Sequence, residues 1–242
     1  MELIYKPNIF INHPEVESAL SLRVDSSITF DMSFKTCKDS NKVKSNRLLF
    51  TSLLGFSPNK IRTLNQVHGD KCCEVSSYSY EDQVKADSMF TNEKNILLSI
   101  TVADCIPILI FDPVNKCIAA IHSGWRGSKL NIVKKTINKL ILNYNSLPNQ
   151  LVAYIGASAG SCCYEIGEDV SNLFDPKFST LKEGNKFLFD NKAVVLSQLE
   201  SSGLLSQNIE LDSNCTICNS KYHSFRRDGT GSGRMFASIG LK

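Results

Sequence analysis

The sequence contains no hydrophobic run long enough to cross a bilayer, and neither sign of charge dominates it. A membrane helix needs about 18 to 20 consecutive apolar residues, and Asp104 and Pro107 interrupt the best candidate stretch. The formal net charge is only +3, and the Lys and Arg residues are scattered rather than gathered in a basic stripe. We therefore expect no membrane span and no nucleic-acid partner.

Signals for export and for division into domains are also missing. The first residues lack a basic segment followed by an apolar stretch and a cleavage site. The nine cysteines are odd in number and lack the regular spacing of a disulfide framework. We expect a cytoplasmic protein with reduced thiols. Because no linker or repeat interrupts the 242 residues, we expect one domain spanning 1–242.

What the sequence does contain is an alternation of short apolar runs and polar breaks, which is typical of strands. The runs between residues 96 and 111 are nearly continuous, which predicts strands covered on both faces. A helical period then extends from Ser128, the predicted N-cap, to Tyr144. Further strands are predicted at residues 9–11, 28–30, 118–121, 151–155, 209–211, 222–225 and 234–239, and further helices at 47–54 and 190–199.

Three dispersed side chains are candidate ligands of one metal ion. Cys105 and His122 each lie at the end of an apolar run, next to a polar or glycine-rich break, and His68 lies upstream in a Val-His-Gly turn. Two imidazoles and one thiolate suit zinc, and three protein ligands leave a fourth position for a reactant. Spacing alone leaves open that each is an ordinary packed or hydrogen-bonded residue.

A second metal signal is the Cys-x-x-Cys pair Cys215 and Cys218, with His223 nearby. These three residues fall short of the four ligands of a structural zinc site, so two unligated cysteines are the simpler interpretation. The neighbouring cysteines Cys162 and Cys163 would point to opposite faces of a strand, which argues against joint chelation.

Arginines and carboxylates are candidates for anion binding and proton transfer. Guanidinium groups bind phosphate in a planar, bidentate manner, although each of these arginines also suits a solvated surface. The candidate clamps are Arg47, Arg126, Arg226 and Arg227. Asp104, Asp87 and Glu165 are candidates either for proton transfer or for hydrogen bonds that support the metal ligands, and capping or turn roles are equally ordinary for them.

Several motifs together resemble the YfiH-like family, the bacterial laccase-domain or polyphenol oxidase family related to the mammalian protein FAMIN. The match runs in order from about Asn46 to the C-terminus. Its motifs are residues 66–69 (Gln-Val-His-Gly), 86–87, 101–107, 122–127 (His-Ser-Gly-Trp-Arg-Gly), 162–167 (Cys-Cys-Tyr-Glu-Ile-Gly) and 224–229 (Ser-Phe-Arg-Arg-Asp-Gly).

The resemblance implies an α+β fold, a single-domain layered sandwich of mixed β-sheets with helices on the outer faces, as a monomer or homodimer. It implies zinc-binding enzymes that cleave adenosine, inosine and S-methyl-5'-thioadenosine with phosphate and also deaminate adenosine. The metal ligands would be His68, Cys105 and His122, with zinc expected and copper as the alternative ion. Residues 156–161 lack both prolines of the family pattern, which leaves the preferred nucleoside open.

We assign further roles on this basis. Asp104 and Cys105 are the expected catalytic residues, and Arg47, Arg126 and Arg227 the expected contacts to purine nucleoside and phosphate. A metal-free cysteine hydrolase or amidase using Cys105 is the principal alternative. A copper-dependent phenol oxidase is weaker, because multicopper centres need roughly ten or more histidines and the chain has 4. A non-catalytic binding module is the third alternative.

Overall fold

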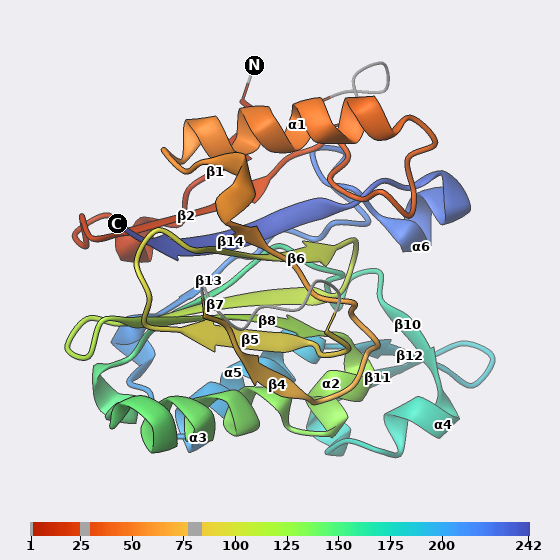
Figure 1. Ribbon diagram of the computed structural model, residues 1–242. Helices are drawn as coiled ribbons and strands as arrows, with labels where there is room; N and C mark the ends of the chain where they lie inside the picture. The colour runs from red at the N-terminus through yellow and green to blue at the C-terminus, as the bar shows by residue number, and fades with distance from the viewer. Residues whose placement is uncertain (1, 25–29, 77–83) are drawn as a thin grey trace.

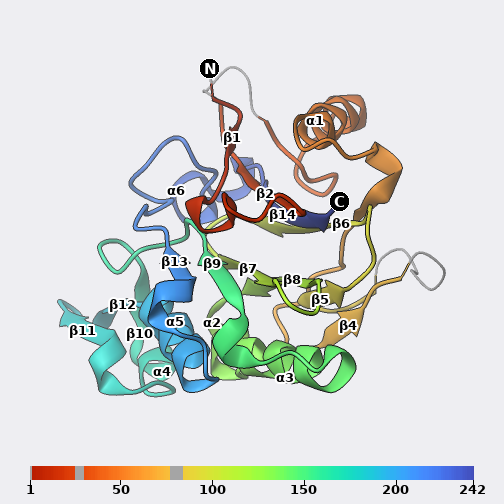
Figure 2. The same ribbon diagram turned by 90° about the vertical axis from the view of Figure 1, so that its left-hand side faces the viewer.

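The computed structural model describes residues 2–24, 30–76 and 84–242. Two sheets pack face to face, and helices cover the outer face of each (Figure 1). Helix α1 (Ser40–Leu53) lies over one sheet, whereas α3 (Ile132–Tyr144) and α5 (Asn191–Ser201) lie under the other, as Figure 2 also shows. The predicted layered α+β sandwich is therefore confirmed.

The two main sheets are mixed, and a small antiparallel sheet flanks them. The five-stranded sheet has the order β1 (Ile4–Tyr5), β2 (Val16–Ser21), β14 (Met235–Leu241), β6 (Leu97–Val102), β3 (Ile61–Arg62). The six-stranded sheet has the order β13 (Ile209–Leu211), β9 (Val152–Ile155), β7 (Ile106–Asp112), β8 (Cys117–Ser123), β5 (Ser88–Thr91), β4 (Cys72–Glu74). The small sheet has the order β10 (Glu165–Gly167), β12 (Lys186–Phe189), β11 (Ser179–Lys182).

Apolar side chains fill each interface between layers. One buried cluster, including Leu20, Ile100 and Leu109, lies between the two main sheets. A second, including Ile108 and Ile137, lies between the six-stranded sheet and its helices. Because β7 faces apolar layers on both sides, all of its residues are buried, as the nearly continuous apolar run predicted.

Three local predictions were wrong. Ser128 is not an N-cap but lies inside a separate short helix, α2 (Trp125–Lys129), and α3 begins only after Asn131, whose φ is 58°. The run at 222–225 leads into a single helical turn, α6 (Phe225–Asp228), because the Ser224 hydroxyl accepts a hydrogen bond from the Arg227 N–H. The run at 9–11 overlaps a 3-10 helix, Asn8–Phe10.

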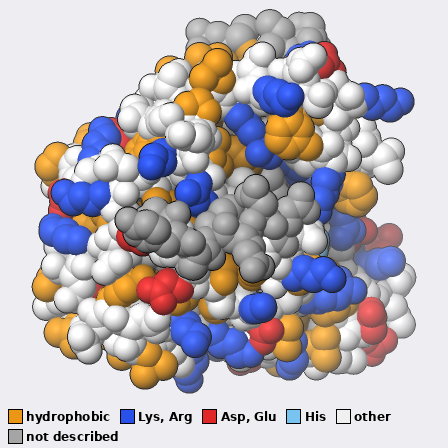
Figure 3. Space-filling model, viewed as in Figure 1, with side chains coloured by type: hydrophobic (Ala, Val, Ile, Leu, Met, Phe, Trp, Pro, Cys, Tyr) orange, Lys and Arg blue, Asp and Glu red, His pale blue; other side chains and the backbone are white. Residues whose placement is uncertain are grey.

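The remaining α-helix of the described chain is α4 (Glu168–Ser171), which packs beside the small sheet. The strand predicted at 28–30 falls mainly outside the described residues. Within the described part, no helix combines the length and the apolar content that a membrane crossing requires. On the face drawn in Figure 3, Lys and Arg side chains are dispersed rather than collected in one stripe.

Candidate metal centre and pocket

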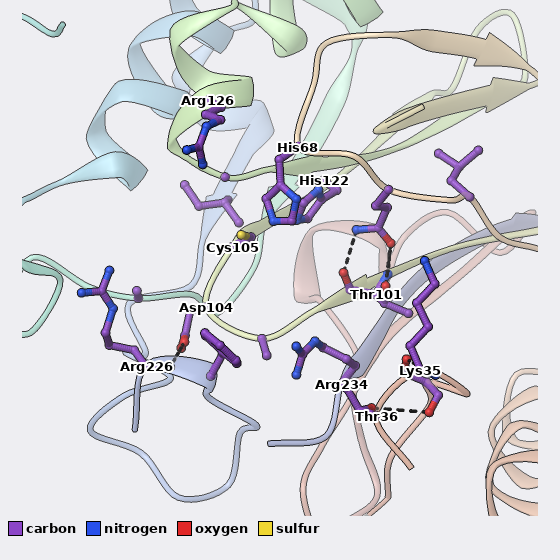
Figure 4. Close-up of a pocket in the computed structure, with 18 of the residues that line it drawn as sticks. Lys35, Thr36, His68, Thr101, Asp104, Cys105, His122, Arg126, Arg226 and Arg234 are labelled. Atoms are coloured by element: carbon purple, nitrogen blue, oxygen red, sulfur yellow. Dashed lines mark hydrogen bonds between the residues drawn. The ribbon is translucent and has the colours of Figure 1, made fainter. Parts of the chain in front are cut away.

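The three predicted donors converge at one end of the two sheets. The ligand atoms of His68, Cys105 and His122 all lie within 4.8 Å of one another. The two imidazole rings meet edge to face, with centroids 4.9 Å apart, and Figure 4 shows the thiol pointing toward both rings. His122 is buried, Cys105 is half-buried and His68 is exposed. The arrangement can hold one ion with its open side toward solvent.

The three donors come from two loops and the end of a strand, far apart in the chain, which is why no short sequence motif contains them. Cys105 lies in the loop that carries the chain from β6 in one sheet to β7 in the other. His122 is near the end of β8, opposite Pro107 of β7. His68, with a φ of 59°, lies in the loop before β4. Gln66 fastens that loop to β6 through hydrogen bonds with Thr101.

A buried carboxylate, Asp87, joins two of the three ligands. Its Oδ1 lies 2.8 Å from His122 Nδ1 and accepts a hydrogen bond from the His68 backbone N–H at 3.0 Å. Its Oδ2 accepts from the N–H groups of Val67 and Gly69. Because Asp87 occupies Nδ1, the Nε2 atom of His122 remains available for a metal.

Charge at the centre favours a thiolate. Burial raises the pKa of Cys105, but the His122 and His68 imidazoles lower it more, to about 6. Burial lowers the pKa of His122, but the Cys105 thiolate and Asp87 raise it to about 9. In the metal-free protein at neutral pH, these two groups therefore form a thiolate–imidazolium pair. The thiolate is the form that binds metals and the form that attacks electrophiles.

Gly124 leaves the space that this convergence needs. A Cβ at this position would lie 3.1 Å from Cys105 Sγ and 3.3 Å from His68 Cδ2. Its φ of −75° is accessible to alanine, so Gly124→Ala should crowd the donors without straining the backbone. We expect Gly124→Ala to lower zinc affinity about tenfold, measured by competition with a chromogenic chelator.

The matched control is Gly231→Ala, since no atom of the described residues lies within 4 Å of an added Cβ at Gly231. This variant should bind zinc as the wild type does. Equal affinities for the two variants would show that the donors do not need the space beside Gly124.

The three donors line one wall of a cavity of about 790 Å³, a volume suited to a small organic ligand. Both main sheets and the C-terminal segment contribute to its lining. Aromatic side chains provide flat apolar surfaces, and among the described lining residues basic groups outnumber the single carboxylate. The aromatic residues are Phe34, Trp125, Tyr164 and Phe225, and the charged ones are Lys35, Arg47, Asp104, Arg126, Arg226 and Arg234.

Of the arginines predicted to bind substrate, two line this cavity and one does not. Arg126 stacks on Trp125 at 4.2 Å, and its guanidinium donates no hydrogen bond within the described residues. Arg47 lines the cavity, but its guanidinium donates to the Met32 carbonyl at 2.8 and 2.6 Å. Arg227 is absent from the lining. Its guanidinium is occupied by Asp228 and by the carbonyls of residues 216, 217, 219 and 222.

Asp104, the predicted catalytic carboxylate, lies beside Cys105 on the cavity wall and has a φ of 84°. Each carboxylate oxygen accepts a hydrogen bond of 2.6 Å, one from the Thr216 hydroxyl and one from the Arg226 N–H. The side chain therefore ties the Cys105 loop to two segments of the C-terminal region. Glu165, the third candidate carboxylate, instead pairs with Lys182 at the protein surface.

Two functional candidates were missed or ranked too low from sequence. Arg234 was not singled out, although it lines the cavity beside Phe225. Asp87 was named without a way to choose between a turn role and a metal-supporting role. The only sequence evidence was that the Ala-Asp pair at 86–87 is one of the motifs shared with the YfiH-like family. The fold was needed to show that the Asp87 carboxylate contacts the His122 imidazole.

One prediction about the other cysteines was wrong. The thiols of Cys162 and Cys163 do not point apart, because these residues lie in a turn rather than in a strand. Together with Cys215 and Cys218 they form a second group with sulfurs within 4.8 Å of one another. His223 is not part of this group; it is buried, and its Nε2 has no hydrogen-bond partner among the residues that the structure describes.

Comparison with known proteins decides the family. The family described as multi-copper polyphenol oxidoreductase laccase matches residues 24–242. The chain belongs to this laccase-domain family. A protein named purine nucleoside phosphorylase from Clostridium acetobutylicum is 33% identical over 190 residues, which cover 76% of this chain and 78% of the relative. Human purine nucleoside phosphorylase LACC1 is 28% identical over 209 residues, covering 83% of this chain and 48% of the relative.

Solved structures agree with this laccase-domain assignment. The Bacillus licheniformis protein YfiH superimposes with a TM-score of 0.88 at 26% identity, covering 94% of this chain and 93% of that one. YlmD from Geobacillus stearothermophilus gives a TM-score of 0.89 at 23% identity, covering 98% and 94%, which supports the fold. The resemblance to the YfiH-like family is thereby confirmed.

The word multi-copper in the family description does not fit the donors of this laccase-domain chain. Only two of its 4 histidines, His68 and His122, belong to a group of potential metal ligands among the described residues. The donor set therefore suits one metal ion rather than a multicopper centre.

Proposed function

We propose that this chain is a purine nucleoside phosphorylase that cleaves adenosine, inosine and S-methyl-5'-thioadenosine with phosphate. The products are the free base and ribose 1-phosphate or its methylthio analogue. The observation that carries the proposal is the His68, Cys105 and His122 cluster on the wall of a cavity rich in arginine and aromatic side chains. The names of the relatives agree with the same reaction.

The donor set fits a zinc ion held by His68, Cys105 and His122, because two imidazoles and a thiolate can converge on it and leave one position open. When bound, such an ion supplies a Lewis acid at the cavity wall. Copper also accepts imidazole and thiolate, so elemental analysis of the purified protein has to identify the ion.

For phosphate, Arg126 is the best supported contact. Its guanidinium lines the cavity and is not consumed by hydrogen bonds to the described residues, so its donors can bind an anion. Arg234, which directly precedes β14, can add a second positive charge to the cavity. Arg47 contributes charge to the same cavity, while its hydrogen bonds to Met32 fix its position. This placement leaves no such role for Arg227.

For the base, the aromatic side chains of the lining provide stacking surfaces, and Asp104 is the proposed proton-transfer group. An ionised carboxylate has about four acceptor positions, of which Thr216 and Arg226 occupy two. The remaining positions can take a proton from, or return one to, a bound purine. The same group would assist the proposed adenosine deaminase activity.

A second candidate is a cysteine hydrolase, favoured by the chain of contacts from Cys105 to His122 to Asp87. A nucleophile, a base and a carboxylate in this order are the parts of a catalytic triad. A triad needs one imidazole, however, whereas His68 brings a second one to the same thiol. We therefore favour the metal site, and with it a reducing, cytosolic environment that keeps Cys105 from being oxidised.

The test is chromatography of bases released from a panel of nucleosides, with and without phosphate. We expect adenosine, inosine and S-methyl-5'-thioadenosine to release base only when phosphate is present, with formation of the sugar 1-phosphate. Ammonia release from adenosine without phosphate measures the deaminase activity separately. Arg126→Ala should raise the KM for phosphate by about tenfold or more, since a hydrogen bond to a charged group contributes about 1.5–3 kcal/mol.

Arg227→Lys serves as the control for that substitution, because Arg227 lies outside the cavity lining; once correctly folded, it should keep the phosphate KM. If none of the nucleosides in the panel reacts, even at high enzyme concentration, a non-catalytic binding module becomes the better interpretation.

A further inference from the structure

A second group of thiols lies outside the cavity described above. The sulfurs of Cys162, Cys163, Cys215 and Cys218 are all within 4.8 Å of one another. Cys218 Sγ is 3.0 Å from Cys163 Sγ and 3.5 Å from Cys162 Sγ. None of the four residues lines the 790 Å³ cavity, so the phosphorylase proposal does not use them.

Two loops from distant parts of the sequence bring these thiols together. In the first loop, the N–H groups of Cys163 and Tyr164 both donate to the Gly160 carbonyl, at 3.0 and 2.9 Å. This turn brings the side chains of two consecutive cysteines to one side, which a strand cannot do. In the second loop, the Asn219 N–H donates to the Cys215 carbonyl at 3.0 Å, which folds the Cys-x-x-Cys segment back on itself.

The two loops are also joined directly. The Thr216 N–H donates to the Ser158 carbonyl at 3.0 Å, and the Gly160 N–H donates to Cys215 Sγ at 3.3 Å. A Cβ on Gly160 would lie 3.1 Å from Cys215 Cβ and 3.4 Å from Cys162 Sγ, so a larger residue here would crowd the two loops. An N–H group that points at a sulfur stabilises the thiolate, which is the form that binds metals.

We propose that these four cysteines bind one Zn²⁺ ion as a structural site, in addition to the His68, Cys105 and His122 centre. Four thiolates complete tetrahedral coordination and leave no position for a reactant. With zinc–sulfur bonds of about 2.3 Å, tetrahedral geometry places the sulfurs about 3.8 Å apart. The observed separations, from 3.0 Å up to the 4.8 Å limit, bracket that value.

The gathering of all four sulfurs favours a metal over disulfides. A disulfide joins two sulfurs and has no need of a third close by. Cys218 instead lies within 3.5 Å of two different thiols, and Cys215 is in the same group. Cys162 and Cys218 are exposed, so zinc can reach the group from solvent.

The location of the group suggests what the ion does. Between its two Cys-x-x-Cys ligands lies Thr216, whose hydroxyl holds Asp104 beside Cys105. Directly after Cys163 comes Tyr164, which lines the cavity. A zinc ion between the two loops would therefore hold two lining residues of the cavity, Asp104 and Tyr164, in position without itself lining the cavity.

The experiment is zinc counting by mass spectrometry on purified protein that has been loaded with zinc chloride and desalted. The wild type should hold two ions per chain, and Cys105→Ala one. The paired change Cys162→Ser and Cys218→Ser should also leave one ion, and the combination of all three changes none. Cys162 and Cys218 are the chosen positions because exposed side chains contribute little core packing.

Two further measurements make the assignment specific. In the Cys105→Ala background, cobalt chloride should produce thiolate-to-cobalt charge-transfer absorption, and a zinc chelator should lower the Tm. Both effects should disappear when Cys162 and Cys218 are also replaced by serine. Cys37→Ser is the control, since Cys37 lies outside both groups, and it should retain two ions.

Folded Cys105→Ala protein that retains no zinc, or whose four cysteines prove by mass to be two disulfides, would overturn the proposal. Because these measurements count metal in the absence of Cys105, their outcome does not depend on phosphorylase activity. Conversely, an inactive wild type that holds zinc at the four cysteines would contradict the proposed function alone.

Discussion

Replacing Cys105 by alanine is expected to remove the metal ion from its centre and to lower kcat/KM for phosphorolysis by about 10²- to 10³-fold, comparable to the loss of a group that stabilises developing charge. The physical reason is that Cys105 supplies the only thiolate of the three-donor group. With it gone, two imidazoles remain, which is fewer than the three protein ligands typical of a catalytic zinc site. The substitution also removes the negative charge that raises the pKa of His122.

Metal content and activity have to be measured together, because loss of activity alone also fits a nucleophilic Cys105. The centre should lose its zinc in the variant, whereas Cys37→Ala should keep wild-type zinc and activity. Metal-free wild-type protein that remains active and is inactivated by iodoacetamide would favour the cysteine hydrolase instead.

The second large effect is expected for Asp87→Asn. The carboxylate accepts hydrogen bonds from His68 and His122 on one oxygen and from Val67 and Gly69 on the other. An amide has only one acceptor oxygen, so its NH₂ group must face donors in either orientation. Leaving buried donors unsatisfied should reduce the free energy of unfolding by about 3 kcal/mol, and zinc affinity should fall about 10- to 100-fold.

Asp112→Asn is the matched control. Asp112 is also a buried carboxylate that accepts backbone N–H groups, here those of Val114 and Asn115 in the turn between β7 and β8. Both variants should lower the urea midpoint, but only Asp87→Asn should weaken zinc binding in chelator competition. If the two variants bind zinc equally well, Asp87 supports the fold and not the metal ligands.

The sequence allowed buried strands to be predicted because burial leaves a pattern, whereas the layered sandwich as a whole was implied by the family resemblance. The apolar run of β7 indicated a strand covered on both faces, and all its residues are buried. The break before α3 could not be predicted in the same way. Asn131 adopts a φ of 58°, and the spacing of the apolar residues around it gives no information about this backbone angle.

The site was partly predictable for a related reason. Cys105 and His122 stood out because each follows or ends a strand beside a polar break, and the fold brings them to His68. The direction in which a side chain points within a turn could not be predicted from the sequence. Arg226 and Arg227 are consecutive, yet Arg226 lines the cavity and Arg227 bonds to carbonyl groups behind it. The turn that unites Cys162 and Cys163 was missed in the same way.

The account as a whole depends on one ion bound by His68, Cys105 and His122 at the cavity wall. Its most direct test is anomalous diffraction at the zinc absorption edge, from crystals of active wild-type enzyme grown with zinc chloride. We predict a peak at bonding distance from all three donor side chains. Crystals of active enzyme that show no metal peak between these residues would contradict the account, whatever is found at the four cysteines.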